Sequence, residues 1–177
     1  MPILNWRRIC SYVAVVCGTA GPVWDDPGHD AFVVGVGDGL VMSQLGHTAF
    51  EKISADASDA AYYVFSLISP PGFGIPPHIH TAEDEIIYVA SGDYEIILGS
   101  ESLQAGPGSI LNFARGTAHG FANVGNTSGE TIWTVTPGGN FQAFFHELAA
   151  FPPGPPDPAV LGELFGRYGI ELLPPPG

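Results

Sequence analysis

One stretch of this chain, residues 72–92, constrains its fold and its chemistry more than any other. The sequence there, GFGIPPHIHTAEDEIIYVASG, contains His78, His80 and Glu85. Side chains two positions apart on a β-strand point to the same face, so the two histidines point the same way. Glu85 lies five positions after His80, and an unbroken strand would turn it to the opposite face. A turn in the polar run 81–84 would reset this alternation, so we expect Glu85 to face the histidines.

Neighbouring residues complete a candidate metal site. Pro76 and Pro77 exclude a helix before the first histidine and favour an edge strand or an extended entry. A further histidine, His119, follows in GSILNFARGTAHGFAN, and on a separate strand it would close around the other three side chains. Imidazoles combined with a carboxylate favour Fe, Mn, Ni, Co, Cu or Zn over Ca or Mg. The residues predict one divalent transition-metal ion; the alternative is a pair of surface histidines beside an acidic loop.

The spacing of these residues resembles the two motifs of the cupin superfamily. The first motif matches at each fixed position: Gly72, five residues, His78-x-His80, four residues, Glu85, six residues, Gly92. The second reads Gly108, five residues, Ala114-x-Gly116, two residues, His119, three residues, Asn123, with alanine at 114 where the family usually has proline. The expected strand order and helical tail are also similar to single-domain cupins of the quercetin 2,3-dioxygenase-like kind.

The resemblance implies a fold and a class of function. The fold would be all-β, a cupin-type double-stranded β-helix (jelly-roll) barrel with short C-terminal helices. The function would be that of a metal-dependent dioxygenase acting on a hydrophobic or aromatic small molecule, with Glu85 as both ligand and general base. Two alternatives stay open: a non-oxidative cupin isomerase, cyclase or dehydratase of natural-product metabolism, and a non-catalytic small-molecule-binding cupin. Small cupins of this kind also imply a homodimer, and outward apolar positions such as Tyr88 support it.

Length and charge limit the alternatives. A chain of 177 residues suits one domain with its own core, and the H-x-H pattern occurs once, which indicates a single cupin unit. The net charge is −13, and the permanent cations are limited to Arg7, Arg8, Lys52, Arg115 and Arg167. This balance argues against nucleic acid and against anionic membranes as partners.

Short apolar segments between glycine turns predict the strands of a sandwich or barrel. We expect strands at 31–36, 40–45, 60–68, 86–90, 94–98, 109–113, 117–123 and 131–136. Residues 52–58 are interpreted as a polar loop, and Gly92-Asp93 as the turn of a hairpin between 86–90 and 94–98.

Two helices are expected after the barrel. Asn140 is the expected cap of the first, whose apolar face is Phe141, Phe144, Phe145 and Leu148. Asp157 with Pro158 begins the second, whose stripe is Leu161, Leu164, Phe165 and Tyr168, and Gly169 ends it. Packing on the barrel explains both faces; alternatively, the first helix covers the barrel mouth and its phenylalanines reach the substrate. The segment PPGPP at 152–156 is expected to be a stiff loop.

Alternation along the strands predicts the walls of a substrate pocket. If Glu85 and His119 point inward, so do Ile87 and Phe121 on their strands, while Trp133 shares a face with Val135 in the last strand. The candidate substrate-binding residues are therefore Ile87, Phe121 and Trp133. Arg115 would pair with an acidic neighbour or bind an anionic substrate group. His29, His47 and His146 have no partners in the sequence and are interpreted as surface or loop residues.

The N-terminal residues 1–22 admit two interpretations. Arg7 and Arg8 before an apolar run resemble a short secretory signal, and the sequon at Asn126 would then be a glycosylation site. Alternatively, this segment packs on the barrel or on a partner subunit. The protein is accordingly either cytoplasmic or secreted, with the barrel at 23–140 and the helical tail at 141–177.

Overall fold

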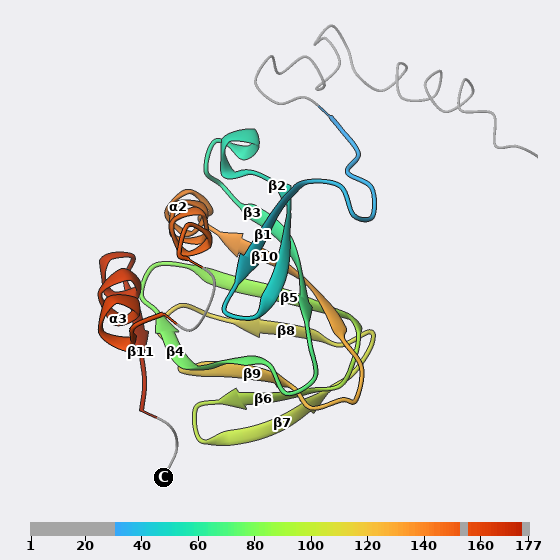
Figure 1. Ribbon diagram of the computed structural model, residues 1–177. Helices are drawn as coiled ribbons and strands as arrows, with labels where there is room; N and C mark the ends of the chain where they lie inside the picture. Colours follow the sequence, from blue (N-terminus) through green and yellow to red (C-terminus); the bar gives the residue numbers. More distant parts are fainter. Residues whose placement is uncertain (1–30, 153–155, 175–177) are drawn as a thin grey trace, which may run out of the picture. The chain divides into compact units, whose positions relative to one another are not determined.

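The computed structural model describes residues 31–152 and 156–174, and within these ranges the strands form two antiparallel sheets (Figure 1). The six-stranded sheet has the order β1-β2-β3-β10-β5-β8. Its strands are β1 (Leu40–Gln44), β2 (His47–Ile53), β3 (Tyr63–Ser69), β10 (Gly129–Thr136), β5 (Asp84–Ser91) and β8 (Ile110–Phe113). The expectations for residues 1–22 and for residues 153–155 of the proline-rich loop lie outside the described residues.

The five-stranded sheet has the order β11-β4-β9-β6-β7. Its strands are β11 (Ile170–Leu172), β4 (Gly74–His80), β9 (His119–Asn123), β6 (Tyr94–Leu98) and β7 (Glu101–Ala105). A 3-10 turn, η1 (Ala55–Ser58), lies between β2 and β3, and two helices follow the last long strand: α2 (Gly139–Ala149) and α3 (Pro158–Arg167). This arrangement confirms the predicted all-β jelly-roll with short C-terminal helices.

The core lies between the two sheets, where alternate side chains of each strand are buried. In β10, which lies between β3 and β5, Trp133 and Val135 are buried. The side chain of Ile132 points to the opposite face of the sheet and is exposed. In β5, Ile87 and Val89 are buried while Tyr88 faces out, as the alternation predicted. Large aromatic side chains dominate the centre, and their burial supplies the main stabilising term for a domain with so few charges.

Helix α2 buries the face predicted for it, and α3 buries Leu164 and Phe165 of its predicted stripe. Phe141, Phe144, Phe145 and Leu148 of α2 are buried, and α2 packs against β1 and β3. Asp157 caps α3 through its side chain, which accepts a hydrogen bond from the Ala159 amide at 2.8 Å, with Pro158 in the first turn. The expected cap of α2 was wrong. The helix begins one residue before Asn140, with Gly138 at the N-cap and no side-chain cap bond, and the Asn140 side chain contacts Glu83 and Tyr168 instead.

Three other expectations from the sequence were wrong. The segment 31–36 is not a strand, and Val36 is fully exposed because no neighbouring strand pairs with it. Residues 52–58 are not one loop, since β2 extends to Ile53 and η1 follows. Gly92-Asp93 is not a hairpin turn. It is a corner at which the chain passes from β5 in one sheet to β6 in the other.

Candidate metal centre

The structure brings together the four side chains selected from the sequence. His78 and His80 lie on β4, Glu85 on β5 and His119 on β9, and all four are buried. One potential ligand atom of each residue lies within 4.8 Å of the corresponding atoms of the others. The bend at 81–83 separates β4 from β5, which belong to different sheets, so Glu85 faces the histidines across the barrel as predicted.

A close approach between β4 and β9 places two of the histidines opposite each other. Ile75 pairs with Phe121 and His78 pairs with His119, so β4 carries one extra residue between these pairs. Pro76 and Pro77 occupy this β-bulge, where the missing N–H groups interrupt no ladder bond. A side chain at Gly120 would place its Cβ 3.0 Å from the Ile75 carbonyl oxygen and the Pro77 nitrogen. Glycine at 120 therefore allows the two strands to lie this near.

Backbone carbonyls fix the orientation of two of the rings. Nδ1 of His78 lies 2.9 Å from the carbonyl oxygen of Pro76, and Nδ1 of His119 lies 2.9 Å from that of Thr117. A carbonyl oxygen only accepts, so each Nδ1 carries the proton and donates it. When these rings are neutral, their Nε2 atoms present lone pairs to the centre of the cluster, which is the form in which imidazole binds a metal.

The short distances between the inward ligand atoms are compatible with a shared cation. The Nε2 atoms of His78 and His80 are 3.1 Å apart, and Nε2 of His119 is 3.0 Å from Oε2 of Glu85. Neutral nitrogen lone pairs facing each other, or facing a carboxylate, repel unless a proton or a metal ion lies between them. Ligand atoms bonded to one ion at about 2.1 Å and at right angles lie about 3 Å apart. The spacing and the donor set therefore fit one transition-metal ion.

Burial and mutual charge set the protonation of the cluster. Burial and the neighbouring His119 lower the pKa of His78 to about 4. Burial raises the pKa of Glu85, but the charge of His80 and the hydrogen bond to His119 outweigh it, and the net shift is downward. Burial lowers the pKa of His80, but Glu85 and Glu83 raise it by more. At neutral pH Glu85 is ionised and His78 is neutral, which is the state of both groups that binds a metal.

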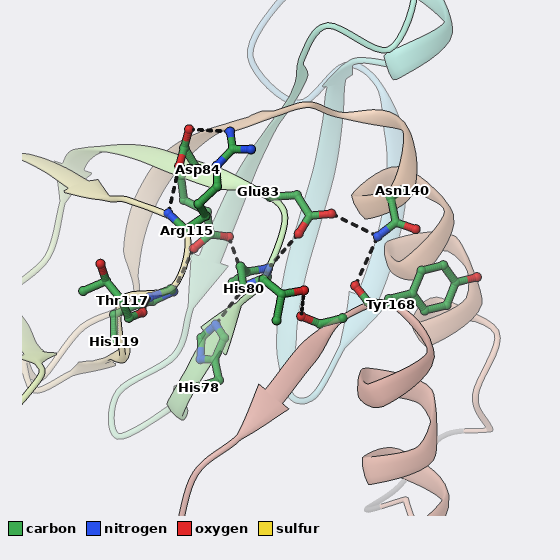
Figure 2. A network of polar contacts seen from close by, with 12 residues as sticks. His78, His80, Glu83, Asp84, Arg115, Thr117, His119, Asn140 and Tyr168 are labelled. Atoms are coloured by element: carbon green, nitrogen blue, oxygen red, sulfur yellow. Dashed lines mark hydrogen bonds and ion pairs between the residues drawn. The ribbon is translucent and has the colours of Figure 1, made fainter.

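Residues not selected from the sequence hold the ligand rings. Phe113 of β8 stacks on His119 with ring centroids 4.3 Å apart, and Phe141 of α2 lies 5.5 Å from His80. Glu83 is 1% exposed and lies beside His80, with Nδ1 of His80 3.7 Å from its Oε2. Figure 2 shows the Glu83 side chain between His80 and Asn140. Its place in the polar run 81–84 indicated only a turn, and nothing in the sequence distinguishes a buried carboxylate there from an exposed one.

The next carboxylate along the chain points elsewhere. Asp84 accepts hydrogen bonds from the Arg115 backbone amide and from its guanidinium, the latter at 2.7 Å (Figure 2). These bonds lower the pKa of Asp84 to about 2. Of the two roles considered for Arg115, the pairing with an acidic neighbour is the one observed.

Three residues of the cluster, His78, His80 and Glu85, form part of the wall of an otherwise largely apolar cavity. It has about 50 Å³ of free space for the centres of water molecules. Seven of its 17 lining side chains are phenylalanine or tryptophan: Phe65, Phe121, Trp133, Phe141, Phe144, Phe145 and Phe165. Two of the predicted substrate-binding residues, Phe121 and Trp133, are in this wall. Ile87 is not, and lines a second, smaller cavity with Val89 and Tyr94.

The interpretation of His47 as a surface residue was wrong. His47 begins β2, is 1% exposed and lines the same cavity, with Nδ1 3.0 Å from Oγ of Ser69. Burial lowers its pKa, which keeps it neutral. His146 is exposed, as expected, but lies in α2 and contacts Glu51 at 2.7 Å. His29 lies outside the described residues.

Comparison with known proteins agrees with this architecture. Residues 65–135 match the model of the cupin domain. The fold is that of a cupin. The polyketide cyclase RemF from Streptomyces resistomycificus superposes with a TM-score of 0.54 at 21% identity, over 61% of this chain and 80% of that one. The cupin domain of Cnp3 from Schizosaccharomyces pombe gives a TM-score of 0.52 at 10% identity, over 58% and 71%.

A predicted oxalate decarboxylase from Thermotoga maritima is also similar, with a TM-score of 0.49 at 22% identity, over 51% of this chain and 79% of that one. A comparison with curated proteins found no match. No helix in the described ranges is both long and apolar enough to cross a membrane.

Proposed function

We propose that this cupin is a metal-dependent enzyme that acts on an apolar, aromatic small molecule, and that its reaction is a dioxygenation. The observation that carries the proposal is the buried cluster of three histidines and one glutamate, of which His78, His80 and Glu85 line an aromatic cavity. His78, His80, Glu85 and His119 would hold the ion. When bound, the ion supplies Lewis acidity toward a substrate oxygen and, where the metal is redox-active, electron transfer with dioxygen.

The chain's own residues provide binding and proton transfer. The aromatic walls suit the faces of a planar ring system and exclude water from the site. Glu85 is ionised, fully buried and directed at the cluster, so it can take the proton of an acidic substrate hydroxyl group. Few other polar groups line the cavity, so the cluster itself provides most of the recognition of a substrate oxygen.

Substrate entry would require α2 to move. The present free space holds a few water molecules, whereas a small-molecule site usually needs about 300 Å³ or more in all. Four side chains of the wall, Phe141, Phe144, Phe145 and Leu148, come from α2. This supports a role for α2 as a cover whose phenylalanines contact the substrate.

A non-oxidative reaction is the second candidate. It is favoured by the similarity of the fold to that of a polyketide cyclase, which extends over 61% of this chain. The same cavity would bind an aromatic or polyketide-like substrate, and Glu85 would move a proton without any change in the oxidation state of the ion. A cyclase, an isomerase and a dehydratase all fit this description.

Two measurements test the proposal. Metal analysis of protein purified without added metal should give about one transition-metal ion per chain. The metal-loaded protein should then convert flavonols or related phenols with stoichiometric consumption of oxygen. Turnover that proceeds without oxygen would favour the second candidate. Tight binding of one of these compounds, with no turnover of any of them, would favour a binding protein.

A further inference from the structure

One metal-ligand candidate is held differently from the other two. Nδ1 of His78 and Nδ1 of His119 each face a backbone carbonyl, but Nδ1 of His80 faces the carboxylate of Glu83. The two atoms are 3.7 Å apart, both are buried, and neither has a hydrogen-bond partner among the described residues. A small rotation of the His80 ring would close this gap to hydrogen-bond distance.

The other carboxylate oxygen of Glu83 accepts a hydrogen bond from α2, the helix whose side chains line the cavity. Nδ2 of Asn140 donates to Oε1 of Glu83 at 3.0 Å and to the carbonyl of Tyr168 at 3.1 Å (Figure 2). Asn140 lies in the first turn of α2, next to Phe141, whose ring contacts His80. The carboxylate of Glu83 therefore lies in a continuous chain of contacts from His80 to α2.

We propose that Glu83 is the positioning residue of His80 and that it links the metal site to α2 through Asn140. When an ion binds Nε2 of His80, the ring turns, Nδ1–H donates to Oε2 of Glu83, and both unpartnered atoms gain a bond. A carboxylate in this position fixes the ring and strengthens the imidazole as a ligand. The proposal rests on the proposed metal binding.

The burial of Glu83 argues for such a role. A carboxylate that is 1% exposed is costly unless its oxygens are paired. Asn140 satisfies one oxygen, and the second has no partner in the described structure. If Glu83 served only to close the 81–84 turn, an exposed side chain would do so without this cost.

Four variants of the full chain test the proposal, with Zn²⁺ and Co²⁺ affinity measured by competition against a chelator. Glu83→Gln removes the charge that faces His80, and Asn140→Ala removes the contact from α2. The double variant Glu83→Gln/Asn140→Ala combines them. Glu147→Gln is the matched control, because it makes the same change at a glutamate of α2 that pairs with Arg167 at the surface. The unfolding midpoint of each metal-free variant reports whether it folds.

Glu83→Gln should weaken metal binding about 10- to 100-fold, the usual scale for loss of a carboxylate that orients a histidine ligand. It should also change the visible spectrum of the Co²⁺ form, which a purely structural role would not do. Asn140→Ala should have a smaller effect in the same direction. The double variant should bind no more weakly than Glu83→Gln alone, because Asn140 acts through Glu83.

Four outcomes would count against the proposal in different ways. An affinity of Glu83→Gln within about twofold of the Glu147→Gln control would overturn the positioning role. Additive losses in the double variant would overturn the link through Asn140. If wild type binds no ion, the proposed function itself fails. Should Glu83→Gln not fold, Asn140→Ala replaces an exposed residue, and unaltered affinity in that variant would overturn the link.

Discussion

His78 and His119 lie directly opposite each other across the β4–β9 ladder, and each ring is anchored to the backbone carbonyl two residues before it in the chain. The same local device thus sets the tautomer of both ligands, and it does so without help from side chains elsewhere. The orientation of both rings is already fixed in the metal-free protein, so metal binding at these two positions would require little rearrangement.

The first prediction concerns metal content. Wild type should carry about one ion per chain, and His78→Ala/His119→Ala should reduce this to less than about a tenth, because two of four ligands are lost. The barrel keeps its own aromatic core, so circular dichroism should change little. His146→Ala, which removes an exposed histidine of α2, is the control and should keep its ion. Full occupancy in the double variant would refute the assignment of the site.

The second prediction concerns the role of Glu85. Glu85→Gln keeps the shape of the side chain and one oxygen but removes its basicity. If Glu85 is the general base, turnover by the metal-loaded variant should fall about 100-fold or more. Glu95→Gln, at a surface position bonded to Ser102, should turn over normally. Near-normal turnover in metal-loaded Glu85→Gln would leave Glu85 as a ligand only.

The third prediction concerns stability against pH in the presence of a chelator. The pKa of His78 is about 4 in the folded protein, below its ordinary value of 6.5. Between these values the unfolded chain binds more protons at this position, so the contribution of His78 to stability is lost as the pH falls from 6.5 to about 4. We expect His78→Gln to remove about 1 to 3 kcal/mol of this pH dependence.

Urea unfolding of both proteins across this pH range would measure the effect. A slope of unfolding free energy against pH that is the same in wild type and His78→Gln would show that His78 is not held in its neutral form by the fold.

The fourth prediction is a homodimer, which we propose forms through the outer face of the six-stranded sheet. Ile132, Tyr88 and Ile110 lie side by side there in the strand register, and all three are exposed. Tyr88→Glu should convert the dimer to a monomer, because it places a charge in the middle of an apolar surface. Leu103→Glu, at an exposed apolar position of the other sheet, is the control. A monomer mass for wild type at micromolar concentration in light scattering would contradict the proposal.

The sequence was informative where a residue type and its spacing carry the chemistry. The four metal-ligand candidates followed from residue type and spacing, and the inward alternation of Ile87 and Phe121 followed from the period of a strand. The spacing could not show which sheet a strand joins. The chain on either side of Gly92 has the pattern of a hairpin, although β5 and β6 pair with other strands.

The positions of isolated polar residues could not be predicted from the sequence either. His47 has no patterned neighbours, so nothing in the sequence indicated that it lies inside the cavity. Glu83 and Asn140 are 57 positions apart, and their contact depends on where α2 packs. β7 and β11 were missed for a different reason: one is exposed along most of its length and the other has three residues, so neither shows a clear hydrophobic pattern.

The absence of a side chain at Gly120 has a consequence for how precisely the site is built. A methyl group there would touch no ligand and no substrate, yet it would meet the β4 backbone at 3.0 Å and force the strands apart by a few tenths of an ångström. His119 and His78 would separate by the same amount. The distance between the two histidine rings is thus set by the packing of the β4 and β9 backbones at Gly120. A Gly120→Ala variant would therefore prefer metal ions of a different radius from those that the natural chain prefers.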